Sequence, residues 1–144
     1  MLYEFCAENV TLLEKAMEAG AQRIELCDNL AVGGTTPSYG VIRAAVDLAK
    51  PYGATVMTMI RPRGGDFVYT DLEIGIMLAD IQKAKEAGSQ GVVFGVLTEK
   101  NEIDVSKMQR LLEACKGLEV VFHMAFDSIP AEYQFGEMDW LIEN

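Results

Sequence analysis

The chain is short of basic residues. Its 144 residues include 12 lysines and arginines against 22 aspartates and glutamates, which gives a formal net charge of −10 at pH 7. Binding to nucleic acid or to an anionic membrane surface requires a basic patch, so we expect neither as a partner. A small anionic ligand would need arginines gathered locally at its site.

The chain also lacks long apolar runs and has few cysteines. No stretch approaches the roughly 18 apolar residues of a membrane span, and the start, Met1–Glu4, lacks the basic residues of a signal peptide. Three cysteines are an odd number, which argues against a disulfide framework and fits a reducing compartment. We therefore expect a cytoplasmic protein whose cysteines are free thiols or metal ligands.

Nothing in the sequence divides the chain into parts. Half of the residues are hydrophobic and 24% are charged, which is an ordinary globular composition. No linker, low-complexity segment or block of like charge interrupts it. We expect one domain over residues 1–144, long enough to bury a core.

An internal repeat predicts β/α units. Residues 18–26 return as residues 86–94, and each copy has the pattern of a helix end, a glycine C-cap and a strand. Short apolar strands are expected at about residues 2–6, 23–27, 55–60, 91–96 and 118–123. Helices are expected between them, with caps at Asn9, at Thr70 with Glu73, and at Asp104. This alternation is typical of a parallel sheet that is buried on both faces.

A parallel sheet of β/α units either stays open or closes as a barrel. Charged and thiol side chains at several strand ends favour the barrel, because barrel sites draw residues from several strands. A complete barrel takes roughly 250 residues, whereas Leu141–Asn144 has the pattern of the last turn of a fifth helix. We therefore expect a TIM (β/α)8 barrel truncated to about its first five β/α units. The apolar edges of such a sheet predict a homo-oligomer.

Two similar motifs place thiols and carboxylates on neighbouring strands. Glu4–Cys6 and Glu25–Cys27 share the pattern Glu-x-Cys, in which the Glu and the Cys lie on one face of a strand. In adjacent parallel strands, about 4.8 Å apart, we expect both pairs to converge. Cys6 and Cys27 are candidate Cu(I) ligands, because Cu(I) prefers soft sulfur. The alternative is that they are buried core thiols.

The two carboxylates of these motifs, Glu4 and Glu25, would lie inside the barrel. An ionised carboxylate is costly there unless it is paired, so each needs a partner such as Arg61, Arg63 or a substrate. They suit general acid and base catalysis if burial raises their pKa. An internal salt-bridge network is the alternative.

The loop Arg61–Phe67 is the most distinctive irregular segment. Arg61 and Arg63 offer bidentate donors to a phosphate or carboxylate, and the glycines between them and Asp66 let backbone amides approach. We take Arg61, Arg63 and Asp66 as candidate binding residues. A turn in which the arginines neutralise Asp66 or Glu25 is the alternative.

His123 is the only histidine in the chain and follows an apolar strand. It is a candidate proton shuttle or third metal ligand, or a hydrogen-bonded core residue. Asp127 could orient His123, bind a ligand hydroxyl or cap the next segment. Met57 and Met59 would share one strand face with Arg61, either as core filling or as soft sulfur near Cys27.

Five motifs, in order along the chain, resemble the copper-homeostasis CutC family. They are Arg23–Cys27, Gly33–Gly40, Ile60–Phe67, Gly95–Leu97 and Phe122–Asp127. The resemblance covers nearly all of this chain but only the first part of a typical family member. It implies a cytosolic TIM-barrel protein linked to copper handling, with Cu(I) bound through cysteines.

Three functions therefore remain open. The first is copper binding through Cys6 and Cys27, which the resemblance favours. The second is a TIM-barrel enzyme acting on a small anionic metabolite, with the arginines binding it and Glu4, Glu25 or His123 moving a proton. The chemistry of the residues alone favours this enzyme, because carboxylates and arginines suit Cu(I) poorly. The third is an inactive remnant of a barrel.

Overall fold

The structure is a computed structural model that describes residues 1–144. Strands and helices alternate along the chain. The strands are β1 (Glu4–Glu8), β2 (Arg23–Cys27), β3 (Thr55–Met59), β4 (Gly91–Phe94) and β5 (Glu119–Phe122). The α-helices are α1 (Leu13–Glu18), α2 (Tyr39–Ala49), α3 (Asp71–Ala87), α4 (Val105–Ala114) and α5 (Ala131–Glu143). Three short 3-10 helices are η1 (Leu30–Val32), η2 (Lys50–Tyr52) and η3 (Met124–Ser128). No helix has the length and apolar character that crossing a membrane requires.

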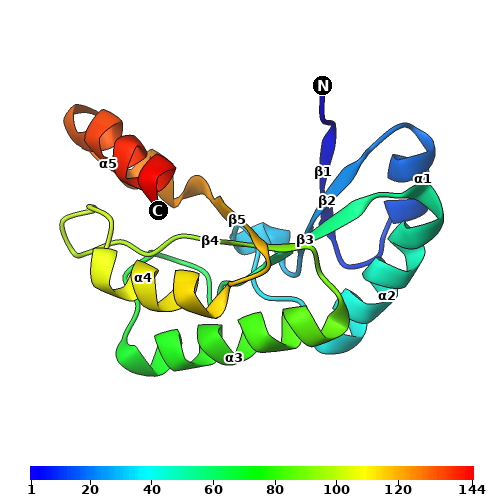
Figure 1. Ribbon diagram of the computed structural model, residues 1–144, viewed down its shortest axis with the longest axis horizontal. Coiled ribbons are helices and arrows are strands. Elements are labelled where there is room, and N and C mark those ends of the chain that lie inside the picture. The colour runs from blue at the N-terminus through cyan, green and yellow to red at the C-terminus, as the bar shows by residue number, and fades with distance from the viewer.

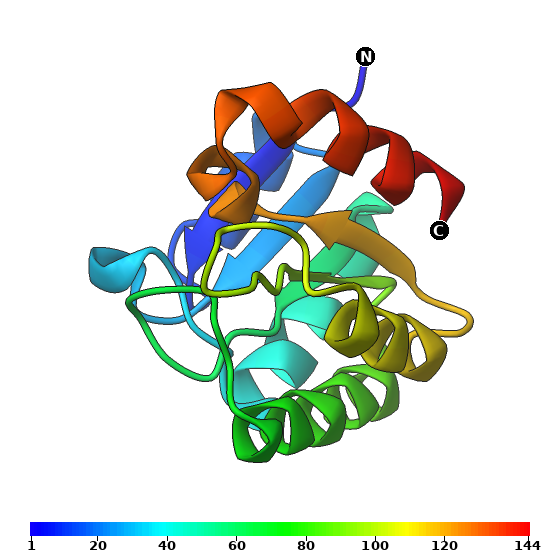
Figure 2. The same ribbon diagram turned by 90° about the vertical axis from the view of Figure 1, so that its left-hand side faces the viewer.

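The five strands form one parallel sheet in chain order, β1-β2-β3-β4-β5. Each strand pairs with the next one, as in a barrel wall, whereas a doubly wound sheet reverses its strand order. Figure 1 shows the helices in an arc around the sheet, from α1 through α2, α3 and α4 to α5. Figure 2 shows β1 and β2 running side by side. The expected α/β fold with a parallel sheet is confirmed.

Two of the predicted helix caps are present. Thr70 accepts a hydrogen bond from the Glu73 amide, and the Glu73 side chain accepts one from the Thr70 amide, which is a capping box at the start of α3. Asp104 accepts a hydrogen bond from the amide of Lys107 at the start of α4. These side chains satisfy amides that the first helical turn leaves unpaired.

The predicted cap at Asn9 is wrong. The first helix begins at Leu13, and Asn9 lies in a turn with a φ of 59°. Its Oδ1 accepts a hydrogen bond from the amide of Val10, the next residue. Because β1 extends to Glu8, Asn9 belongs to the turn directly after this strand and does not cap the following helix.

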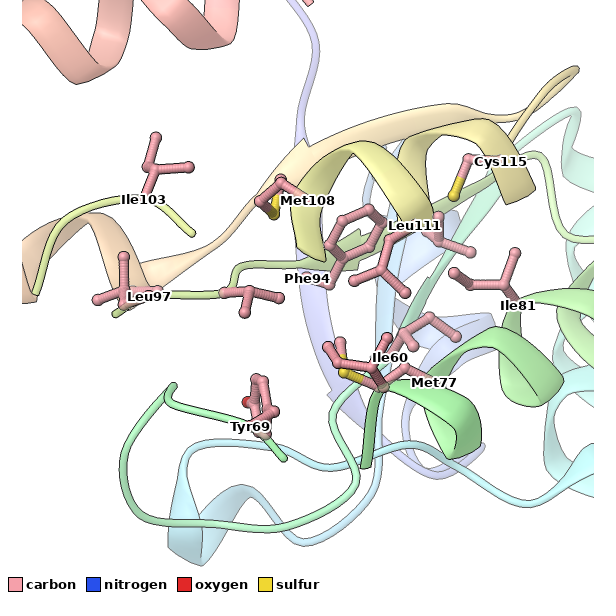
Figure 3. Close-up of a cluster of buried hydrophobic side chains, with 14 of the residues drawn as sticks. Ile60, Tyr69, Met77, Ile81, Phe94, Leu97, Ile103, Met108, Leu111 and Cys115 are labelled. Atoms are coloured by element: carbon pink, nitrogen blue, oxygen red, sulfur yellow. The ribbon is translucent and has the colours of Figure 1, made fainter. Parts of the chain in front are cut away.

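The sheet has an apolar outer face, which packs against the helices. Phe94 of β4 lies between side chains of α3 and α4, as Figure 3 shows. Cys115, which follows the last residue of α4, is buried in this cluster. A second cluster packs β1 and β2 against α1 and α2, and includes Ala7, Ile24 and Leu26. Burial of these side chains holds the strands against the helices and fixes which residues point to the other, inner face.

The inner face is concave. Arg23 of β2 forms ion pairs with Glu4 of β1 and with Glu119 of β5, the latter at 3.9 Å. In a flat sheet, three strand spacings would separate β2 from β5 by about 14 Å. The sheet therefore curls toward its inner face, as the wall of a barrel does.

Candidate metal centre

The pairing register of β1 and β2 decides which inner-face side chains meet. Cys6 lies opposite Glu25, and Glu8 lies opposite Cys27. Oε1 of Glu25 is 3.5 Å from Sγ of Cys6 and 3.9 Å from Sγ of Cys27. One ligand atom from each of Cys6, Glu25 and Cys27 lies within 4.8 Å of the others. We call these three residues the thiol cluster.

Glu4 is not part of the thiol cluster, although its charge contributes to the raised pKa of both Cys6 and Glu25. The register pairs Glu4 with Arg23 at the amino-terminal end of the strands, where the two form a salt bridge. The register therefore offsets the two Glu-x-Cys motifs by two residues along the sheet. Neither Glu4 nor Glu25 pairs with Arg61 or Arg63, which have other partners.

The two thiols of the cluster hold their protons tightly, and burial also acts on Glu25 beside them. Burial raises the pKa of the Glu25 carboxyl, although hydrogen bonds from the thiols oppose this rise. Burial, followed by the charge of Glu25, raises the pKa of the Cys6 thiol. Burial above all raises the pKa of the Cys27 thiol well beyond its ordinary value. Both thiols are therefore protonated at neutral pH, and a metal ion must displace their protons to bind.

Solvent reaches the thiol cluster from one side. Cys6 is exposed, whereas Cys27 is buried beneath the loop that follows β2. A Cβ added to Gly34 of this loop would lie 3.1 Å from Sγ of Cys27. Met57 and Met59 pack with Cys27 in the small apolar cluster of the inner face. Cys6 is thus the entrance to the cluster, and Cys27 is its enclosed end.

Arg61 is buried and ties two loops together. Its guanidinium donates hydrogen bonds of 2.8 Å and 2.9 Å to the carbonyls of Val32 and Gly34, in the loop after β2. It donates another, of 2.8 Å, to the carbonyl of Gly65 in the loop after β3. Arg61 therefore adjoins the thiol cluster through Gly34 without belonging to it.

Arg63 and Asp66 pair with each other, whereas Arg61 forms no ion pair. Arg63 forms ion pairs with Asp66 at 3.0 Å and with Glu73 of α3 at 2.5 Å. A hydrogen bond from the Thr70 backbone and the Arg63 guanidinium lower the pKa of Glu73. The predicted cradle of two arginines is therefore not formed. Arg63 instead fits the alternative, a turn in which an arginine neutralises Asp66.

His123 lies directly after β5, as predicted, and is buried. Its Nδ1 accepts a hydrogen bond of 3.2 Å from the amide of Ala125, and its ring lies 5.0 Å from that of Phe67. Burial lowers its pKa to about 4, so the ring is neutral at pH 7. It is not in the group that could hold a metal. Of the three roles open for Asp127, orientation of His123 is not observed, because Asp127 is exposed in η3 and Nδ1 accepts its hydrogen bond from Ala125.

Sequence reasoning missed Glu8 and Tyr69. Glu8 is the next inner-face residue after Cys6, lies opposite Cys27 and accepts a hydrogen bond of 2.6 Å from the amide of Leu30. Strand alternation would have found it if the first strand had been extended past residue 6. Tyr69 is buried in the loop before α3, and its hydroxyl has no hydrogen-bond partner. No local pattern in the sequence marks it.

Comparison with known proteins decides the family. The CutC family model matches residues 1–143. This chain belongs to the CutC family. A CutC family protein of Streptococcus pyogenes serotype M6 is 56% identical over 143 residues, which cover 99% of this chain and 68% of that protein. The crystal structure of CutC from Streptococcus agalactiae, named for copper homeostasis, has a TM-score of 0.95 at 53% identity and the same two coverages.

Structures with low sequence identity to this CutC family chain are informative about its fold only. A rubisco-like protein from Burkholderia fungorum has a TM-score of 0.59 at 14% identity, over 85% of this chain and 30% of that protein. The fold is therefore TIM-barrel-like, in agreement with the strand order and the concave sheet.

Proposed function

We propose that this chain serves copper homeostasis by binding Cu(I) through Cys6 and Cys27. The observation that carries the proposal is the placement of two thiols and a carboxylate within 4.8 Å of one another in a chain of the CutC family. Thiolates are the soft ligands that select Cu(I) over harder ions. Free thiols also fit the reducing cytoplasm, which we propose as the compartment.

The donor atoms fit a soft metal ion. Two sulfur atoms no more than 4.8 Å apart leave room for an ion about 2.4 Å from each, close to the roughly 2.3 Å of a metal–thiolate bond. The thioethers of Met57 and Met59, packed beside Cys27, add further soft sulfur near the site. Structural zinc sites are closed by four ligands, whereas the thiol cluster offers three.

Glu25 has a part in the binding step. Its Oε1 accepts hydrogen bonds from both thiols, so it is placed to receive a thiol proton when a sulfur binds the metal. Because burial raises the pKa of this carboxyl, it holds such a proton more readily than an exposed glutamate does. A Glu25→Gln variant keeps both thiols but cannot take up a thiol proton, so it should bind Cu(I) more weakly with the same stoichiometry.

An anaerobic Cu(I) titration against a chromophoric competitor tests the proposal. The wild-type chain should bind one Cu(I), and the Cys6→Ser, Cys27→Ser double variant should lose this binding. Cys115→Ser is the matched control, because Cys115 is a buried thiol on the outer side of the sheet and should leave binding unchanged. Retention of tight binding in the double variant, or its loss in the control alone, would reject the assignment.

A further inference from the structure

Arg61 is a buried cation without a counter-charge. The chain has five arginines, and Arg23, Arg43, Arg63 and Arg110 all form ion pairs with carboxylates. Arg61 is 2% exposed and forms no ion pair, since its side-chain hydrogen bonds go to three backbone carbonyls. A buried charge is costly unless an opposite charge compensates it, even in a hydrogen-bonded site. In a chain with ten more acidic than basic groups, an arginine without a carboxylate points to an anion from outside.

Three buried polar atoms have no hydrogen-bond partner, and Arg61 supplies one of them. They are Nε of Arg61, the hydroxyl of Tyr69 and Nε2 of His123. The three residues are 2%, 2% and 8% exposed. Buried polar groups in folded proteins are nearly always hydrogen-bonded, so unpaired ones require an explanation such as a missing ligand or ion.

All three unpaired atoms can donate. The guanidinium Nε carries a hydrogen at any physiological pH, and a phenol hydroxyl donates readily. For His123, the hydrogen bond that Nδ1 accepts from the amide of Ala125 leaves the ring proton on Nε2. The set therefore offers three donors, of which only the Tyr69 hydroxyl can also accept.

Arg61 links the three donors, because it adjoins Tyr69 and shares the ring of Phe67 with His123. The Arg61 guanidinium carbon is 4.9 Å from the centre of the Phe67 ring, and the centre of the His123 ring is 5.0 Å from the same point. Burial raises the pKa of Tyr69, and the adjacent Arg61 guanidinium opposes this rise. Burial is the main cause of the lowered pKa of His123, and the charge of the same guanidinium is the second cause. In Figure 3, Tyr69 lies at the end of the buried cluster, near Ile60 and Leu97.

We propose that Arg61, Tyr69 and His123 form a binding site for a small oxyanion, a phosphate or carboxylate group. Arg61 supplies the opposite charge, and the other two residues donate hydrogen bonds to the oxygens. The site adjoins the thiol cluster without overlapping it, because Gly34 lies between Arg61 and Cys27. Since the ring of Phe67 packs against Arg61 and His123, it must move aside for the anion to enter. The loop that carries Phe67 contains Gly64 and Gly65, which permit such a movement.

The single histidine provides a specific test. In a chain labelled with ¹⁵N-histidine, the imidazole signals come from His123 alone. Inorganic phosphate and acetate are titrated separately at constant ionic strength, and the Nε2 signal and the melting temperature are followed. We expect a saturable shift of Nε2 and a matching rise in melting temperature for at least one of the two anions. Which anion acts distinguishes a phosphate from a carboxylate ligand.

Tyr69→Phe is the diagnostic variant, because it removes only the unpaired hydroxyl. It should weaken anion binding about tenfold or more, the usual effect of losing a hydrogen bond to a charged group. Tyr52→Phe, at an exposed tyrosine, is the control and should bind like the wild type. Arg61→Ala is less informative, because it also removes three hydrogen bonds that hold the loops.

Two results would overturn the proposal. One is that neither anion gives a saturable response, which would mean that the three donors bind buried water instead. The other is equal anion binding by Tyr69→Phe and the wild type, which places the anion elsewhere. The Cys6→Ser, Cys27→Ser variant should bind the anion normally, so the fate of the copper site does not affect this test.

Discussion

Cys6 and Cys27 share one face of the sheet but not one environment. Cys6 is exposed at the entrance of the thiol cluster, and Cys27 is buried under Gly34. Burial is the main cause of the raised pKa of each thiol. The pair is therefore a poor nucleophile at neutral pH and becomes a good ligand only when a metal displaces the protons.

Cu(I) affinity should rise steeply with pH. The pKa values of both thiols are raised, so each is protonated through the neutral range and must lose its proton on binding. If Glu25 keeps one of the two protons, the affinity gains about tenfold per pH unit, and if both leave, about a hundredfold. Competitor titrations between about pH 6 and pH 8 measure the slope. An affinity independent of pH would contradict ligation by these thiols.

Gly34→Ala should weaken Cu(I) binding by crowding Cys27. The added Cβ would lie 3.1 Å from Sγ, and the φ of 87° at this position already disfavours alanine. Gly20→Ala is a matched control, because Gly20 has a φ of 106° but no atom within 4 Å of an added Cβ. Both variants should lower the free energy of unfolding by about 1 kcal/mol or more. Weaker Cu(I) binding is expected for Gly34→Ala alone, and equal binding by the two variants would contradict the packing argument.

Strand alternation alone predicts that Glu25 and Cys27 share a face, as do Glu4 and Cys6. It does not predict which residue lies opposite which, because register depends on how the connected strands pack. The register observed sets Cys6 opposite Glu25 and Glu4 opposite Arg23. Tyr69 could not be predicted, since its burial results from the packing of a loop against distant residues.

The β3–α3 connection is held by its own side chains. Arg63 bonds Asp66 and Glu73, and Glu73 closes the capping box with Thr70. Local signals of this kind can be read from a few consecutive residues, so the sequence predicted the start of α3 correctly. The start of α1 could not be predicted in this way, because β1 extends to Glu8 and the helix begins only at Leu13.

Thr70→Ala should destabilise the fold by about 1 kcal/mol, the usual cost of losing an N-cap side chain. The reason is that the amide of Glu73 would lose the hydroxyl that accepts its hydrogen bond. Urea denaturation measures the change, and Thr11→Ala, at an exposed threonine, is the control and should stay within about 0.5 kcal/mol of the wild type. A cost for Thr70→Ala no greater than that of the control would show that the cap contributes little.

At the scale of the whole molecule, the repeat of helix, glycine and strand predicted the parallel sheet, and the barrel expected from the strand-end side chains implies its chain order. The curvature of the sheet was not accessible from the sequence, because it depends on how strands twist against one another. Arg23 reveals it by reaching Glu119 across the concave face. This curvature gathers side chains of β2, β3 and β5 on one inner surface.

The 144-residue chain should self-associate in solution. The outer edges of β1 and β5 have no paired strand, and unpaired edges favour contacts with other chains. Phe135 and Ile142 of α5 are 77% and 76% exposed, which adds apolar surface. Light scattering coupled to size-exclusion chromatography should give a mass at least twice that of one chain. A monomer at micromolar concentration would contradict this prediction.

The proposed function requires that copper be held by the two thiols of the inner face. Copper K-edge X-ray absorption of the chain loaded with one equivalent of Cu(I) tests this most directly, with Cys115→Ser measured beside it. We predict that sulfur atoms are the nearest neighbours of copper in both samples, and that Cys6→Ser, Cys27→Ser loses this shell. A first shell of nitrogen or oxygen atoms in the wild-type chain would contradict the assignment.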